Sequence, residues 1–535
     1  MKKKVLCLVI AISLIISAFV IPVHANTDVT DKTEQKLYTV LDKIANAAVG
    51  GIAALIATPR WANAKTYKSE NFYPGNTPEE FKEESSDDAV WKIGYANASL
   101  LKGNEVGTCY VGGSLKVTKK LATKQYDDQK VRVIAVSDGG KINIFACLDA
   151  YGLANSDVRG IRAQFAEYAK ENSLDINTVN VSVLHQHSCV DTFGMNGDII
   201  NALFTSSFKN LFGIKTESGQ NPEYMENLYN VTVDCMKKAV ENMTEGELYY
   251  GSADVSQYIR DKRLPEVFEG EMTRLRFIPA DDNLKEIWIC NCGIHCVGNG
   301  AGGTELTGDY PLYMEKYINE NYNADFFYLE GAELALTSKG DDITPDPEVV
   351  EQVGDEGFAT VIKYGETLAR KIAGIENETA VKPRIRVAFT ETMVDIDNNI
   401  LVLAAKGGLL VNTVVKDGLF KYKIPTEVGY AEFGDSIAVA IIPGELAPEI
   451  AYGGADTAET SWYGEDWEYD SFESLAPGKK LLVFGLTNDQ IGYLITSNNW
   501  HSFFTENEEI VSTGRYAGEK ITQEYIALFN KCTAA

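Results

Sequence analysis

The stretch VNVSVLHQHS, residues 179–188, alternates β-branched or apolar residues with polar ones and then reaches His185 and His187. Such alternation predicts a strand, and polar residues directly after it predict a site at the strand's carboxyl end, where α/β sheets hold their ligands. The whole chain has five histidines, so two of them one residue apart are a notable concentration. On this stretch alone, a hydrogen-bonded turn and a metal or catalytic site are about equally well supported.

Four later segments share this layout, an apolar strand that ends in polar residues: 287–294, 325–329, 437–442 and 481–486. His295 and Glu445 follow two of them. Further strands are predicted at 91–99, 107–117, 131–137 and 142–149, and helices at about 156–172, 222–241, 309–322, 356–374 and 445–453. We therefore expect an α/β fold with mixed β-sheets covered by helices and a metal site at the strands' carboxyl ends.

The first 25 residues have the parts of a secretory signal. Lys2 to Lys4 precede an apolar run from Val5 to Val23, and a small-residue cleavage site ends at Ala25. This order predicts cleavage after Ala25 and a secreted or cell-surface protein with no transmembrane segment after processing.

Residues 26–90 are expected to form an N-terminal helix and an acidic linker before a body that spans 91–535. The helix, at 31–58, has apolar residues on one face: Leu37, Val40, Leu41, Ile44, Ala48, Ile52 and Leu55. Its second half, residues 45–56, is too short to span a bilayer, and we expect it to pack on the domain. The alternative is a surface or lid segment that meets lipid.

The amino-acid composition limits the classes of molecule that the protein is expected to bind. Asp and Glu number 76 against 49 Lys and Arg, which gives a formal net charge of −27 at pH 7. This charge disfavours nucleic acid and anionic lipid surfaces, so a small-molecule or lipid substrate is expected. The nine cysteines are too scattered for a small disulfide framework.

The sequence offers two competing cation sites. Cys290, Cys292, His295 and Cys296 could form a Cys/His zinc site, although their spacing is not that of a finger or ribbon. The acidic run 465–470 could hold calcium, but a solvated loop is the better-supported account.

The order of several short motifs resembles the catalytic domain of the neutral/alkaline, non-lysosomal ceramidase family. The motifs are HQHS at 185–188, GIH at 293–295, PGE at 443–445 and NDQIGY at 488–493, with KIGYA at 92–96 and TGD at 307–309. The resemblance covers roughly residues 91–530. It rests on the order of the motifs, because each of them is short.

The resemblance implies a site and an activity. By position in the motifs, His185, His295, Glu445 and Tyr493 would be the ligands of Zn²⁺, and His187 would stand beside the ion. Arg263 is the nearest match to a substrate-binding arginine of the family. The implied protein is an exported zinc-dependent amidohydrolase that cleaves a ceramide-like or other N-acyl amide with a zinc-activated water.

The chain also departs from the family pattern. Cys189-Val190-Asp191 replaces Gly-Pro-Gly, which we expect to reshape the pocket wall, and Thr337-Ser338 stands where the family has its Gly-Asp-x-Ser-Pro serine. Without the family's neighbouring residues, a covalent route through Thr337 or Ser338 is less supported than attack by water. The alternatives are a zinc-retaining, non-catalytic binding protein and a zinc esterase on the same scaffold.

Overall fold

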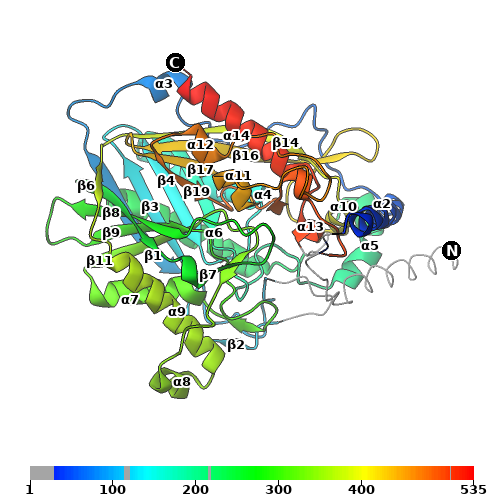
Figure 1. Cartoon of the computed structure of the whole chain (residues 1–535), viewed down its shortest axis with the longest axis horizontal. Helices are drawn as coiled ribbons and strands as arrows, with labels where there is room; N and C mark the ends of the chain where they lie inside the picture. Colours follow the sequence, from blue (N-terminus) through cyan, green and yellow to red (C-terminus); the bar gives the residue numbers. More distant parts are fainter. Residues whose placement is uncertain (1–28, 30, 114–120, 215–217, 506–507, 535) are drawn as a thin grey trace.

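The computed structural model describes residues 29, 31–113, 121–214, 218–505 and 508–534, so the predicted signal segment 1–25 lies outside the described residues. Within these ranges, two large β-sheets form the centre of the molecule (Figure 1). The larger has the strand order β11 (Ala324–Glu330), β9 (Glu286–Cys292), β8 (Glu271–Pro279), β6 (Thr244–Asp254), β1 (Trp91–Ser99), β3 (Lys130–Ser137), β4 (Ile142–Leu148) and β5 (Ile176–Val183), and β13 (Thr379–Val381) pairs with β6. The smaller has the order β14 (Ile385–Asp395), β16 (Tyr422–Phe433), β17 (Ile437–Ile441) and β19 (Lys480–Phe484), and β15 (Val415–Lys416) pairs with β16.

Both sheets are mixed, as the sequence predicts. The pairs β4–β5, β9–β11 and β17–β19 are parallel, whereas β1–β3 and β14–β16 are antiparallel. Successive side chains of a strand point to opposite faces of its sheet. In β4, Phe145 therefore joins the core between the two sheets, and Ile144 joins the core on the outer face.

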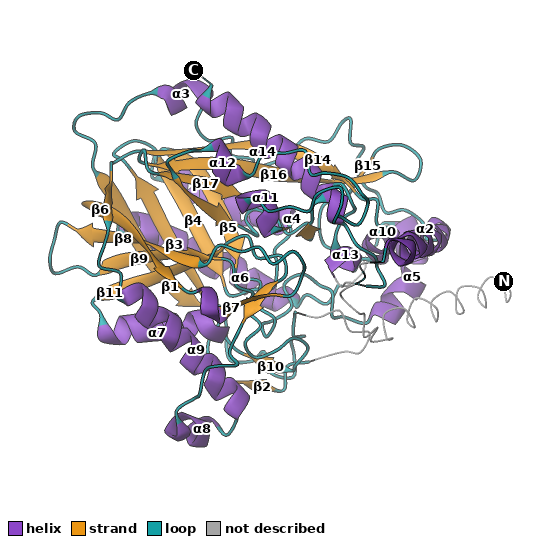
Figure 2. Cartoon of the chain, in the orientation of Figure 1, coloured by secondary structure: helices purple, strands orange, loops and turns teal. Residues whose placement is uncertain are grey.

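Helices cover the outer faces (Figure 2). On the larger sheet lie α4 (Asn155–Glu171) and α6 (Pro222–Glu241), with α7 (Asp309–Asn321) and α9 (Glu356–Ala373) over β11, β9 and β8. On the smaller sheet lie α14 (Ala517–Thr533), α11 (Pro448–Tyr452) and α12 (Phe472–Leu475). The remaining helices are α2 (Lys32–Leu55), α3 (Pro78–Lys82), α5 (Ile199–Phe212), α8 (Pro347–Val353), α10 (Asn399–Gly407) and α13 (Glu508–Val511). No helix in the described ranges is long and apolar enough to cross a membrane.

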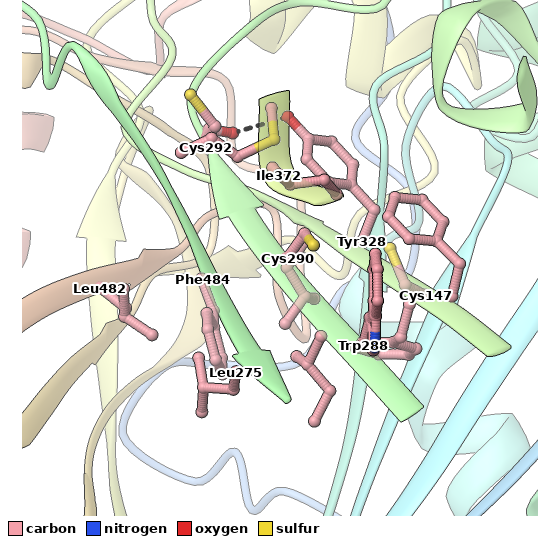
Figure 3. Close-up of a cluster of buried hydrophobic side chains, with 14 of the residues drawn as sticks. Cys147, Leu275, Trp288, Cys290, Cys292, Tyr328, Ile372, Leu482 and Phe484 are labelled. Carbon is pink, nitrogen blue, oxygen red and sulfur yellow. Dashed lines mark hydrogen bonds between the residues drawn. The ribbon is translucent and has the colours of Figure 1, made fainter. Parts of the chain in front are cut away.

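The two faces of β9 pack against different layers. Asn291 faces the smaller sheet and donates to the Val483 carbonyl at 2.8 Å, whereas Cys290 and Trp288 lie with Tyr328 on the face toward α9, near Ile372 (Figure 3). The Tyr328 hydroxyl donates to the Cys292 carbonyl at 3.0 Å. The larger sheet is curved, so that β11 at one edge contacts β3, β4 and β5 at the other, while β19 contacts β9 and β11. This curvature brings the carboxyl ends of strands from both sheets together, as the sequence predicts.

Several local predictions need correction. Residues 107–113 form turns and isolated bridges in place of the strand predicted at 107–117, whose last residues lie outside the described ranges. Helix α4 begins at Asn155, one residue before the predicted start, with Ala154 as its N-cap, where the Asp157 carboxylate accepts from the Ala154 amide at 3.2 Å. Glu445 is not helical but belongs to the short strand β18 (Glu445–Leu446).

Helix α2 forms where predicted, with Asp31 as its N-cap, and its second half packs on the domain as expected, with Val49 and Ala53 in the core of the smaller sheet. The apolar residues of the predicted face are not the ones that do so, because Leu37, Ile44 and Leu55 are exposed whereas Gln35 and Asp42 on the opposite face are buried. Hydrophobic periodicity identifies the two faces of a helix but not which one the protein covers.

Candidate metal centre

His185 stands just beyond the end of β5 with a left-handed backbone (φ 48°), a conformation uncommon outside glycine. Its Nδ1 lies 2.8 Å from the Tyr151 carbonyl, which fixes the tautomer that carries the proton on Nδ1. The Nε2 lone pair is then buried, without a hydrogen-bond partner among the described residues, and lies 3.4 Å from Glu445 Oε2.

His295 repeats this arrangement just beyond β9. Its Nδ1 lies 2.9 Å from the Leu336 carbonyl, and its Nε2 lies 3.1 Å from the same Glu445 Oε2. The preceding Gly293 permits this path, because a Cβ there would lie 2.4 Å from the Ala332 carbonyl oxygen. Burial lowers the pKa of both His185 and His295 to about 3, so both imidazoles are neutral at pH 7.

Three acceptor atoms therefore face one another: Nε2 of His185, Nε2 of His295 and Oε2 of Glu445. Each Nδ1 proton is already used on a carbonyl, so the neutral rings offer only lone pairs to the carboxylate. Buried polar atoms left in this way are costly unless a cation or a proton lies between them. Two nitrogens and a carboxylate oxygen are donors that a divalent metal ion such as zinc accepts.

Glu445 is held by its neighbours along the chain. Strand β18 pairs in parallel with β20 (Tyr493–Leu494), in the register Glu445 to Tyr493. Gln490 Nε2 donates to Glu445 Oε1 at 2.9 Å, which leaves Oε2 facing the two histidines. Burial raises the pKa of Glu445, while His185 and the Tyr493 hydroxyl oppose that rise.

Tyr493 and His187 complete the surroundings of the three acceptor atoms. The Tyr493 ring is parallel to the His295 ring, with centroids 6.4 Å apart. The His187 ring lies 4.7 Å from that of His185 and 5.6 Å from that of His295. Burial lowers the pKa of His187 to about 3 as well. One nitrogen from each of His185, His187 and His295 lies within 4.8 Å of the others.

Solved structures of known proteins share the overall fold of this chain. No family model and no curated protein matches the sequence. Neutral ceramidase from Pseudomonas aeruginosa superposes with a TM-score of 0.61 over 83% of this chain and 75% of that chain, at 13% identity. The chain has the fold of neutral ceramidase. A ceramidase complexed with C2 superposes with a TM-score of 0.59 over 82% of this chain and 75% of that one, at 14% identity.

The ceramidase fold brings two further acidic residues to the centre, which the sequence reasoning missed. Glu333 follows β11, and its carboxylate lies 3.7 Å from His295 Nδ1 and beside Glu330. Burial raises the pKa of Glu333 well above its usual range, and the carboxylates of Glu330 and Glu445 raise it further. With His185 and Glu445, Glu333 forms a second set of atoms close enough to share an ion. The signal was available, since Glu330 and Glu333 both follow a predicted strand.

A cavity of about 400 Å³ opens beside these residues, a size suited to a small ligand or part of a larger one. Its lining includes His187, Lys262, His295, Thr337, Ser338 and Tyr493. Thr337 and Ser338 belong to β12 (Leu336–Ser338), which pairs with β7 (Ile259–Asp261) and forms a bridge to His295. The cavity wall therefore carries both hydroxyl residues that the sequence singled out.

Arg263 lies elsewhere. It is buried and donates from Nη2 to Glu509 Oε1 at 2.8 Å and to the Asn499 carbonyl at 2.7 Å, and it does not line the cavity. Its neighbour Lys262 lines the cavity instead. A role of Arg263 toward substrate stays a prediction, and the contacts seen are those of a structural ion pair.

The segment at which the sequence departs from the family, Cys189-Val190-Asp191, is buried and does not line the cavity. The Asp191 carboxylate accepts from the amides of Phe193, Gly194 and Asn196 and so stabilises a turn. The expectation that this segment reshapes the pocket wall is therefore not met.

The competing cation sites gain no support. All eight cysteines in the described part of the chain are buried free thiols, and burial raises the pKa of Cys290 to about 12. In these ranges, no group with the geometry to hold a metal includes a cysteine or a residue of the acidic run 465–470.

Proposed function

We propose that this chain is a zinc-dependent amidohydrolase that cleaves the N-acyl linkage of a ceramide-like lipid or of another N-acyl amide. One observation carries the proposal. Two neutral, buried imidazoles direct Nε2 at the carboxylate oxygen of Glu445 beside a cavity lined by hydroxyl and cationic residues. The ceramidase fold supports the same reaction class, although fold alone does not determine chemistry.

The residues present fit the proposed metal. His185, His295, Glu445 and Tyr493 would hold Zn²⁺, and the buried, partnerless Nε2 of His185 is the kind of atom that a ligand would satisfy. When bound, Zn²⁺ polarises a carbonyl group and lowers the pKa of a water molecule to about 7. Gln490 fixes the orientation of Glu445, as outer hydrogen bonds commonly do for metal ligands.

The remaining residues bind and orient the substrate. The His187 ring is buried at the wall of the cavity, and the main chain of Gly113 lies against it. Because its pKa is low, His187 serves as a hydrogen-bond partner for the attacking water or the amide rather than as a strong base. The hydroxyls of Thr337 and Ser338 can hydrogen-bond the substrate from another wall of the cavity.

The location of the protein is also a proposal. The basic start, the apolar run and the small-residue site that ends at Ala25 support export and cleavage, which would leave a secreted or cell-surface enzyme. N-terminal sequencing of the exported protein tests this directly, and a mature chain that starts at Asn26 is the expected result.

Turnover of matched amide and ester substrates tests the activity. We expect hydrolysis of a panel of N-acyl amides by the zinc-loaded protein, and loss of that activity in Glu445→Ala but not in Glu348→Ala, a change in the exposed helix α8. Cleavage of esters alone would favour the esterase alternative. Full zinc occupancy without turnover of either substrate class would favour a binding protein.

A further inference from the structure

Helices α2 and α5 lie together at one end of the molecule beside α10 (Figures 1 and 2). Asn210 of α5 donates to the Ala57 carbonyl just beyond α2, which joins the two helices. Their outward side chains are apolar and 40–68% exposed: Leu37, Val40, Leu41, Ile44, Leu55, Phe204, Phe208, Leu211, Phe212 and Ile214. We call this set the α2/α5 face.

In the first half of α2, residues 32–46, the usual orientation of an amphipathic helix is reversed, whereas Val49 and Ala53 in the second half pack on the core. The polar residues Asp42 and Asn46 face the protein, where Asp42 Oδ1 accepts from the Ser502 hydroxyl at 2.7 Å and Asn46 Nδ2 donates to the Asp397 carbonyl at 2.9 Å. At about 100° per residue, Leu37, Leu41 and Ile44 fall on the opposite side. Specific polar contacts therefore hold the helix with its apolar side outward.

Helix α5 shows the same reversal. Its inward side carries Ser206 and Asn210, whose side chains donate to main-chain carbonyls, the Asn210 amide at 2.7 Å to Ala57 and at 2.9 Å to Lys406. Its outward side carries Phe208 and Phe212, whose ring centroids are 4.7 Å apart. Two neighbouring helices thus each expose an apolar side. Soluble monomers rarely expose large apolar patches unless these bind something.

The charges around the α2/α5 face indicate its partner. With the N-caps Asp31 and Asp198 included, residues 31–60 and 198–214 carry five basic side chains and four acidic ones, in a chain whose net charge is −27. Lys36 and Lys43 follow one border of the apolar side of α2, as lysines do in helices that lie in a membrane interface. A second copy of this chain would bring the same lysines and a further charge of −27, whereas lipid headgroups offer phosphates.

We propose that the α2/α5 face docks on the surface of a phospholipid bilayer, with its leucine, isoleucine and phenylalanine side chains among the acyl chains and its lysines at the phosphates. The sequence just before α2 agrees with this partner. The apolar run from Val5 ends at Val23, shortly before the N-cap Asp31, so export through the proposed signal would bring α2 next to the membrane.

Co-sedimentation of the full chain with vesicles of phosphatidylcholine and phosphatidylglycerol tests the proposal. Two variants replace exposed side chains: Leu41→Gln with Ile44→Gln in α2, and Phe208→Gln with Leu211→Gln in α5. The control is Leu284→Gln, a similarly exposed leucine in the turn between β8 and β9, away from α2 and α5 in Figure 1. All forms share the same N-terminus, so a retained leader cannot explain a difference between them.

We expect the wild type and Leu284→Gln to partition equally onto vesicles, and each double variant to partition at least about tenfold less. Unchanged thermal unfolding of the variants would show that they fold. The proposal is overturned if the wild type stays in the supernatant or if the double variants bind as it does. It is also overturned if light scattering shows a wild-type dimer that the double variants dissociate, because a second copy would then cover the face.

Discussion

Replacement of Gln490 by leucine should weaken zinc binding without removing a ligand. Gln490 is buried, and its Nε2 donates to Glu445 Oε1 at 2.9 Å, which leaves Oε2 for the histidines. A hydrogen bond to a charged group contributes about 1.5–3 kcal/mol. Loss of an outer partner of a metal ligand costs about 10–100-fold in affinity, or about 1.4–2.7 kcal/mol. The two ranges overlap, so we expect zinc affinity to fall by about 10–100-fold in Gln490→Leu.

Competition with a chelator of known affinity measures this change, and thermal unfolding of the metal-free protein separates it from misfolding. Gln129→Leu is the matched control, because Gln129 is a fully buried glutamine whose Nε2 donates only to the carbonyls of Ser188 and Thr307. It should lose about 1–3 kcal/mol of folding stability while its zinc affinity stays within about threefold. Equal zinc affinity in wild type and Gln490→Leu, or an equal fall in both variants, would refute the reasoning.

Three further predictions concern other residues. Arg263→Met should lower the free energy of unfolding, measured with denaturant, by about 3–5 kcal/mol, because it leaves Glu509 buried without its cation. Unchanged stability together with lost turnover would instead place Arg263 at the substrate. Thr337→Val should keep turnover within about tenfold if water attacks the amide, whereas loss of all turnover together with an acyl-enzyme in wild type would indicate a covalent route. The pKa of His187 is about 3 in the folded protein, below the ordinary 6.5 of the unfolded chain. As the pH falls, the unfolded chain therefore binds a proton at His187 before the folded protein does, and the free energy of unfolding decreases from about pH 6.5 toward pH 3. The metal-free His187→Asn variant should therefore lose about 2 kcal/mol less than wild type between pH 7 and pH 5, and parallel stability curves would contradict this.

The sequence predicts many strands of the two sheets and most residues of the candidate metal centre, because an apolar run that stops at polar residues marks the end of a strand. His185, His295 and Glu445 were found in this way, and the curvature of the larger sheet then brings them together. Glu333 was missed although it follows the predicted strand 325–329, because the strand-end pattern does not say which of Glu330 and Glu333 contacts the histidines.

Other features depend on tertiary contacts that local patterns do not encode. Lys262 and Arg263 are adjacent, and only the pairing of the short strand β7 decides that Lys262 lines the cavity while Arg263 turns to Glu509. In α2, inward hydrogen bonds from Asp42 and Asn46 outweigh the tendency of Leu37 and Ile44 to be buried. Periodicity alone could not predict that outcome.

The metal content of the purified protein tests the central claim most directly. Elemental mass spectrometry after dialysis should find about one zinc ion per chain in the wild type. The folded double variant His185→Ala with His295→Ala should hold less than about a tenth of that, because it lacks both Nε2 atoms that face Glu445. A wild type that takes up no zinc, or a double variant that keeps its full complement, would contradict the account.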